Sequence, residues 1–190
     1  MFTRNKTTLM LPGFSCSYLV AVLIKYNEDG AERRLVVCSA YLLDDFEDPP
    51  PSTEFYEIVQ YCESENLYLV VGCNSNAHHI LWGSTNCYHR GEALVEFLNS
   101  SNLEILNQGK KPTFCSGDRL EVIDNTLGPF GFLESITKWN VPSEPSLSDQ
   151  RHILFTYRAP YRYASSGTLG ATIGPPFERA RRTDWRGALR

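Results

Sequence analysis

The amino-acid sequence predicts an α/β domain over residues 1–158, followed by a basic and flexible tail over residues 159–190. The first observation is a set of almost continuously apolar runs, typical of strands covered on both faces; these runs are residues 19–24, 34–41 and 67–72. The second is an apolar period of helical spacing over residues 55–62, between two of these runs. The third is a change in composition after residue 158, where Gly, Pro, Ser and Arg dominate and no apolar period survives.

Turn and capping residues divide the first half of the domain into elements. An Asp-Gly pair at 29–30 favours a tight hairpin turn between the first two strands. A loop over residues 44–51 then precedes Ser52 and Thr53, either of which would cap a helix with an acidic first turn. This helix is expected to end near Asn66.

Shorter elements are predicted in the second half of the domain. A helix is expected over residues 91–101, because its apolar side chains fall on one face. Short strands are expected at residues 104–107, 121–126, 134–139 and 152–157. The strands and helices therefore alternate over the first half, whereas the second half consists mainly of strands.

The formal net charge of −4 hides a strong asymmetry along the chain. Residues 1–150 contain 10 basic and 20 acidic residues, whereas residues 151–190 contain 8 Arg and 2 acidic residues. The acidic body is not an obvious nucleic-acid binder by bulk charge. The basic tail is interpreted as a solvated linker, and the alternative is a segment that binds phosphates.

Neither a membrane span nor a secretion signal is expected from the sequence. No segment approaches 18 consecutive apolar residues, and the first ten residues lack a long apolar stretch. A nuclear or cytoplasmic location is therefore predicted, and the six cysteines are interpreted as reduced thiols, with a disulfide framework as the alternative. A zinc cluster is disfavoured, because its ligands would have spacings unlike those of common fingers; they would be Cys73, His78, His79 and Cys87.

Three polar clusters follow predicted strands, at residues 74–79, 123–126 and 148–152. If the strands lie side by side, these clusters converge at one edge of the sheet, where α/β proteins tend to place their chemistry. Asp, Asn and His are the residue types that magnesium-assisted phosphodiester cleavage needs, since carboxylates bind a hard cation and a base activates water. From spacing alone, an interpretation of Asp124 and Asp149 as ordinary turn residues is equally good.

Residues 70–86, which read VVGCNSNAHHILWGSTN, resemble the signature of the endonuclease/exonuclease/phosphatase family, and more narrowly its non-LTR (jockey-like) retrotransposon endonucleases. Further motifs follow in the order shown by that branch: Arg90-Gly91-Glu92, Asn107-Gln108-Gly109, Pro112-Thr113-Phe114, Ile123-Asp124, Trp139-Asn140-Val141 and Ser148-Asp149. The resemblance covers about residues 9–158. It implies a two-sheet β-sandwich flanked by helices, and a hydrolase that cleaves DNA with magnesium and is joined to a reverse transcriptase.

The resemblance also implies roles for individual side chains. Asn76 matches an Asn that contacts the scissile phosphate, and Tyr41 matches a strand-end Tyr that touches it. Asp124 matches the acid that orients the catalytic His, and Asp149 matches an Asp close to the metal. His78 matches a His of the family and is a candidate substrate-binding residue.

Two predicted catalytic positions depart from the family. Asn74 stands where the family has the Asp that activates the nucleophile, and an amide cannot take up a proton at neutral pH. Gln150 stands where the family has its catalytic His, and Gln neither titrates nor becomes cationic. His152 is not expected to replace that His, because it lies about 6–7 Å further along a strand.

The family's opening strands are also expected to be missing, together with a metal-binding Glu. The acids near this end of the chain do not stand in the expected context; they are Glu28, Glu32 and Glu47. The sequence therefore predicts a retrotransposon-derived endonuclease domain that is impaired or inactive. The alternatives are a non-catalytic nucleic-acid-binding module and a still-active magnesium-dependent nuclease.

Overall fold

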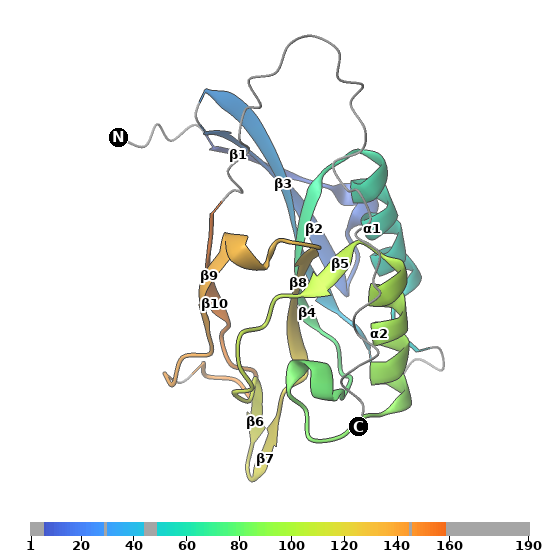
Figure 1. The fold of residues 1–190 in the computed structure, drawn as a ribbon, viewed down its shortest axis with the longest axis vertical. Helices are drawn as coiled ribbons and strands as arrows, with labels where there is room; N and C mark the ends of the chain where they lie inside the picture. Colours follow the sequence, from blue (N-terminus) through green and yellow to red (C-terminus); the bar gives the residue numbers. More distant parts are fainter. Residues whose placement is uncertain (1–5, 29, 44–48, 145, 159–190) are drawn as a thin grey trace. The chain divides into compact units, whose positions relative to one another are not determined.

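The computed structural model describes residues 6–28, 30–43, 49–144 and 146–158. Within these residues the largest sheet has six strands in the order β1-β2-β3-β4-β8-β5. Helices α1 and α2 lie along one face of this sheet, and β9 and β10 lie on the other side (Figure 1). The strands of the sheet are β1 (Lys6–Met10), β2 (Leu19–Glu28), β3 (Ala31–Tyr41), β4 (Tyr68–Asn74), β8 (Asp124–Pro129) and β5 (Leu103–Ile105).

The first three predicted strands are confirmed as β2, β3 and β4. β2 and β3 form an antiparallel hairpin with Glu28 opposite Ala31, and Gly30 takes a positive φ of 80° in the turn between them. Asp29 of the predicted turn lies outside the described residues. β3 and β4 run parallel, with helix α1 as their crossover.

Strand β1 was not predicted, because its residues are polar and mixed. It pairs antiparallel with β2 and forms one edge of the sheet, and all five of its residues are exposed. The prediction that the apolar runs are covered on both faces is wrong for β2. Its Leu19 and Ala21 are buried, but Val20 between them is 43% exposed, because it points to the face away from the helices.

Both predicted helices are confirmed, with shifts at their ends. Helix α1 spans Thr53–Ser64, and Ser52 is its N-cap, where its hydroxyl accepts a hydrogen bond of 3.4 Å from the Phe55 amide. Helix α2 spans His89–Ser100, and so begins two residues before the predicted start.

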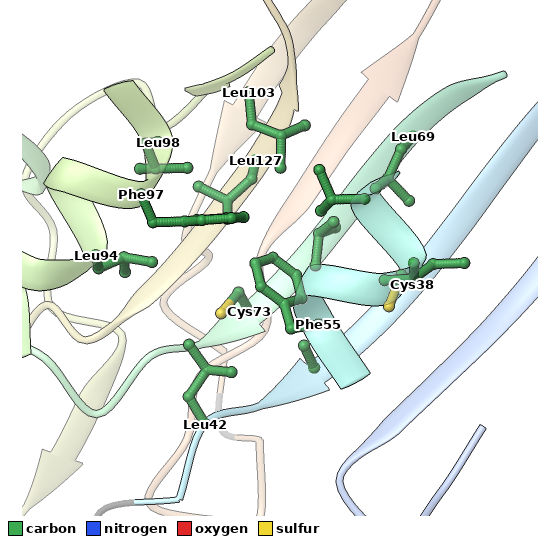
Figure 2. Packing of buried hydrophobic residues seen from close by; sticks show 14 of the residues in the cluster. Cys38, Leu42, Phe55, Leu69, Cys73, Leu94, Phe97, Leu98, Leu103 and Leu127 are labelled. Carbon is green, nitrogen blue, oxygen red and sulfur yellow. The ribbon is translucent and has the colours of Figure 1, made fainter. Parts of the chain in front are cut away.

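Two apolar clusters stabilise the fold on the two faces of the sheet. The larger packs α1 and α2 against the sheet; Figure 2 shows Phe55 and Phe97, whose ring centroids are 5.8 Å apart, together with Cys38, Leu69, Cys73 and Leu127. The smaller lies on the opposite face, and its buried members are Leu35, Val70, Leu106, Phe132, Ile136, Trp139 and Val141. Burial of this kind contributes about 25 cal/mol per Å² of apolar surface.

The later strands are shorter than expected, and their boundaries differ. The predicted strand 121–126 is two elements, β7 (Arg119–Glu121) and β8, and β7 forms a hairpin with the unpredicted β6 (Phe114–Ser116). The start of the predicted strand 134–139 belongs to a short 3-10 helix, Leu133–Ser135, and β9 follows it (Ile136–Asn140). β9 pairs antiparallel with β10 (Leu154–Tyr157).

In the part of the chain that the structure describes, no helix is long and apolar enough to cross a membrane. The predicted basic tail, residues 159–190, lies outside the described residues. Its interpretation as a linker, or as a phosphate-binding segment, therefore stays a prediction.

Candidate functional site

Three of the predicted site residues lie in one row across the centre of the large sheet. Tyr41 at the end of β3 is opposite Asn74 at the end of parallel β4, and Asn74 is opposite Asp124 at the start of antiparallel β8. Neighbouring strands lie about 4.8 Å apart. The strand register thus brings a phenol, an amide and a carboxylate side by side at the ends of three adjacent inner strands. For Asn74 and Asp124, this is the arrangement expected if the polar clusters after neighbouring strands converge.

Asn76 joins this row through a tight turn after β4. Its backbone amide donates a 3.1 Å hydrogen bond to Oδ1 of Asn74, and its φ is +45°. Its side-chain Nδ2 donates a 3.0 Å hydrogen bond to the carbonyl of Leu42, just after β3. The side chain of Asn76 therefore links the ends of two neighbouring strands, and one oxygen of Asn74 already accepts a hydrogen bond in the turn.

The Asp124 carboxyl is half-buried, and its Oδ2 is buried without a hydrogen-bond partner in the structure. Burial raises the pKa of Asp124 above the usual Asp range, and interaction with the Thr113 side chain acts in the opposite direction. An acid in this environment keeps its proton to a higher pH than an exposed Asp. It can then donate a hydrogen bond as well as accept one.

Buried polar side chains fix the strand on which Asp124 lies. The fully buried Thr113 hydroxyl accepts hydrogen bonds from the amides of Ile123 (3.2 Å) and Asp124 (3.1 Å). Asn107 donates to the Asp124 carbonyl at 3.1 Å and accepts from the Thr126 amide at 2.7 Å. Such contacts satisfy backbone groups at the end of a strand that would otherwise be costly to bury.

A second buried pair joins β4 to β8 beneath the site. The Ser75 hydroxyl donates to the Ile123 carbonyl at 2.8 Å and accepts a 3.0 Å hydrogen bond from Nδ2 of Asn125. Both side chains are completely buried. A buried network of this kind rigidifies the site, because breaking any member leaves a polar group unsatisfied.

The segment that carries Asp149 and Gln150 is held against β6 by backbone contacts. The amide of Cys115 donates a 2.8 Å hydrogen bond to the Asp149 carbonyl, and Gln150 forms a β-bridge with Phe114. The Asp149 side chain is exposed, whereas Oε1 of Gln150 is buried without a hydrogen-bond partner. His152 is exposed, so it does not share the surroundings of the Gln150 amide.

His78 lies on the loop after β4 and is paired with an acid from the β6–β7 hairpin. Its Nε2 is 3.8 Å from Oε2 of Glu121, and the other carboxylate oxygen of Glu121 accepts a 2.8 Å hydrogen bond from Arg119. The ring of His78 also lies 5.1 Å from that of Tyr88, measured between centroids. The partly buried imidazole of His78 thus links the loop after β4 to the β6–β7 hairpin.

The possible metal ligands named from the sequence belong to a disfavoured zinc cluster and to the magnesium site that the family resemblance implies. Cys73 is buried in the core while Cys87 is exposed, so the zinc cluster does not form. No group of three or more His, Cys, Asp or Glu side chains in the described ranges could hold a metal ion. For magnesium, Oδ1 of Asn74 already accepts a hydrogen bond, and burial disfavours the charged form of Asp124. Asn74 and Asp124 by themselves therefore do not supply the several negatively charged oxygen ligands that Mg²⁺ needs. The further acid that the family resemblance places near the metal is Asp149, whose side chain is exposed.

A family model described as endonuclease-reverse transcriptase matches residues 35–154. The chain belongs to this family, since the match spans more than half of its length. No curated protein matches the sequence.

Among solved structures, the chain is similar to the endonuclease domain of TRAS1, a telomere-specific non-LTR retrotransposon, with a TM-score of 0.67 and 26% identity. That match covers 83% of this chain and 71% of the TRAS1 domain. It is also similar to the AP endonuclease LMAP from Leishmania major, with a TM-score of 0.59, 10% identity, and coverage of 75% of this chain and 55% of that protein. The second likeness shows the fold alone. The predicted resemblance to non-LTR retrotransposon endonucleases is confirmed. The predicted fold class, an α/β sandwich of the endonuclease/exonuclease/phosphatase type, is confirmed as well.

Some residues that shape the site had no predicted role. Thr113 and Asn107 stand in motifs that were recognised in sequence, but their hydrogen bonds to β8 depend on a fold that spacing does not reveal. Arg90, in another of these motifs, contacts the loops after β3 and β4. The signal that could have drawn attention to these three residues was their presence in the ordered family motifs.

Proposed function

We propose that this chain is a retrotransposon-derived endonuclease domain that binds a DNA phosphodiester at the row Tyr41–Asn74–Asp124 and cleaves it poorly or not at all. The observation that carries the proposal is that row, in which strand register aligns three residues whose roles were predicted separately. Membership of the endonuclease-reverse transcriptase family supports DNA as the substrate class.

The proposed roles follow from the chemistry of each side chain. The hydroxyl of Tyr41, which is 45% exposed, and the second N–H of the Asn76 side-chain amide would donate hydrogen bonds to phosphate oxygens. Asp124 would orient the residue at position 150, and His78 would contact the substrate from the adjacent loop. Asp149, with its exposed carboxylate, remains the candidate for the magnesium ion that the family resemblance implies.

The impairment would arise from two amides in place of titratable groups. Asn74 cannot accept a proton from an attacking water, and Gln150 cannot carry the positive charge of an imidazolium. Removing one general acid or base typically lowers a rate by about 10²–10⁴-fold. Two such losses in one catalytic unit are not additive, so the expected deficit is close to that of the more damaging one.

The test is nicking of supercoiled plasmid with Mg²⁺ by the wild-type chain, by Asn74→Asp, by Gln150→His and by the double variant. We expect weak or undetectable nicking by the wild-type chain and an increase of about 10²-fold or more in the double variant. A matched control makes the same chemical changes at exposed positions, as Asn140→Asp with Gln60→His, and should leave nicking unchanged.

Two other results would count against parts of the proposal. Nicking by the wild-type chain that Asp149→Ala abolishes would show a working enzyme and remove the claim of impairment. Binding of duplex DNA without nicking in a folded double variant would favour the non-catalytic binding module, and the site would then be a phosphate-binding surface only.

A further inference from the structure

The first turn of helix α2 contacts both loops that leave the candidate site. The Arg90 guanidinium donates a 2.7 Å hydrogen bond from Nη2 to the Leu43 carbonyl, after β3. It donates a second, of 3.4 Å, from Nε to the carbonyl of Asn76, after β4. Arg90 is half-buried, and these two carbonyls lie two residues beyond Tyr41 and Asn74 of the site row.

The two loops that Arg90 bridges are also joined to each other. The Leu42 amide donates a 2.8 Å hydrogen bond to the Asn74 carbonyl, and Nδ2 of Asn76 donates to the Leu42 carbonyl at 3.0 Å. Asn76 holds a positive φ of 45°, in the left-handed region that Asn enters more readily than most non-glycine residues. Arg90 contacts the carbonyl of this same residue.

The residues on either side of Arg90, Tyr88 and Gly91, both pack against the loop over residues 76–79. The Tyr88 amide donates a 3.1 Å hydrogen bond to the carbonyl of His78. A Cβ built on Gly91 would lie 2.1 Å from that same carbonyl oxygen, so only glycine allows this approach. The helix and the loop over residues 76–79 therefore behave as one packed unit.

We propose that Arg90 is a positioning residue of the site, whose guanidinium bridges two carbonyls and thereby sets the place of Asn76 and Tyr41 relative to Asn74. Its part in catalysis rests on the proposed function, whereas its part in loop geometry does not. A planar guanidinium presents several donors in a rigid fork, and an ammonium cannot reproduce that geometry. Arg90 acts through the bridge between the two carbonyls.

Conservative variants separate the bridge from the charge. Arg90→Lys keeps the charge and loses the fork, and Arg90→Met loses both; Arg34→Met, at an exposed position on β3, is the control. Amide hydrogen exchange in the wild-type background is followed at Leu42 and Asn76, whose amides donate within the two loops. We expect Arg90→Lys and Arg90→Met each to speed exchange at these amides by about tenfold or more, with β2 and β3 unchanged.

The same variants in the Asn74→Asp, Gln150→His background report on catalysis. A small displacement of catalytic groups lowers rates by up to about 10²-fold, so both Arg90 variants should reduce kcat to a similar extent. The salt dependence of duplex DNA binding should be the same in Arg90→Lys, Arg90→Met and the unsubstituted background, since Arg90 contacts backbone carbonyls and not the phosphate.

The outcomes distinguish this inference from the proposed function. Unchanged amide exchange in both Arg90 variants would overturn the inference that Arg90 positions the loops. A second contrary result would be wild-type exchange in Arg90→Lys together with weaker DNA binding by Arg90→Met. That result would mark Arg90 as a phosphate contact. If the double variant, Asn74→Asp with Gln150→His, does not nick DNA, the proposed function fails. The exchange measurement in the wild-type background still decides whether Arg90 positions the loops.

Discussion

The turn over residues 74–76 and the segment over residues 146–151 both carry predicted catalytic residues, but the fold holds them in different ways. The turn lies above a fully buried pair, Ser75 and Asn125, and its ends are fixed by hydrogen bonds to neighbouring loops. Residues 147–149 of the segment are exposed, and the segment is joined to the domain by backbone hydrogen bonds to β6 and to the residue before it.

The two regions also differ in how well their polar side chains are satisfied by hydrogen bonds. On the turn, Oδ1 of Asn74 accepts a hydrogen bond from the backbone amide of Asn76. On the segment, Oε1 of Gln150 is buried without a hydrogen-bond partner in the structure, which leaves a polar group unsatisfied. The side-chain amide is thus accommodated better at position 74 than at position 150.

The largest expected effect comes from Thr113, which connects the two regions. Its hydroxyl accepts from the amides of Ile123 and Asp124, and its carbonyl accepts a 2.7 Å hydrogen bond from the Arg151 amide. Thr113→Val leaves two amides without an acceptor, and should lower the free energy of unfolding by about 3 kcal/mol in chemical denaturation. Thr113→Ser keeps the acceptor and should cost about 1 kcal/mol for the lost methyl group. Equal losses in the two variants would show that packing, not the hydroxyl, holds the regions together.

An intermediate effect is expected in the pH dependence of stability, through Asp124. Because burial raises the pKa of Asp124, the folded chain prefers the protonated acid. The free energy of unfolding should therefore fall as pH rises from the ordinary Asp value, about 3.9, through the raised value.

Unfolding measured between about pH 3 and pH 7 checks this pH dependence. Asp124→Asn should gain stability relative to the wild-type chain as pH rises. Asp149→Asn removes the same charge from an exposed position and controls for net charge. A gain of equal size in both variants would show that net charge, and not burial at β8, is the cause.

The smallest effect is expected on the exposed segment itself. The Ser146 hydroxyl can donate its one proton to the Ser148 carbonyl, which is exposed, or to the Gln150 carbonyl, which is partly buried. Ser146→Ala should lower the unfolding free energy by less than about 1 kcal/mol, because water can replace such contacts. A loss as large as that of Thr113→Val would contradict the proposed difference between the two regions.

Local pattern predicted the elements that are regular and apolar, and failed where pairing decides. β2, β3, α1 and α2 were recognisable from apolar runs, a Ser cap and helical spacing. β1 was not, since its five exposed residues form a strand only because β2 offers an edge to pair with. The β6–β7 hairpin was missed for a similar reason, since each of its strands has three residues and too few positions to show a period.

The sequence by itself determined the family and the order of the main elements, and it supplied the candidates for the site, because ordered motifs and hydrophobic periods are local properties. Only the tertiary structure decided that Tyr41, Asn74 and Asp124 form one row, since register depends on pairing between strands far apart in the chain. It also decided that Asp124 is held away from water and that Arg90 bridges two loops. Burial and hydrogen-bond partners are properties of the packed chain, and no spacing along the sequence encodes them directly.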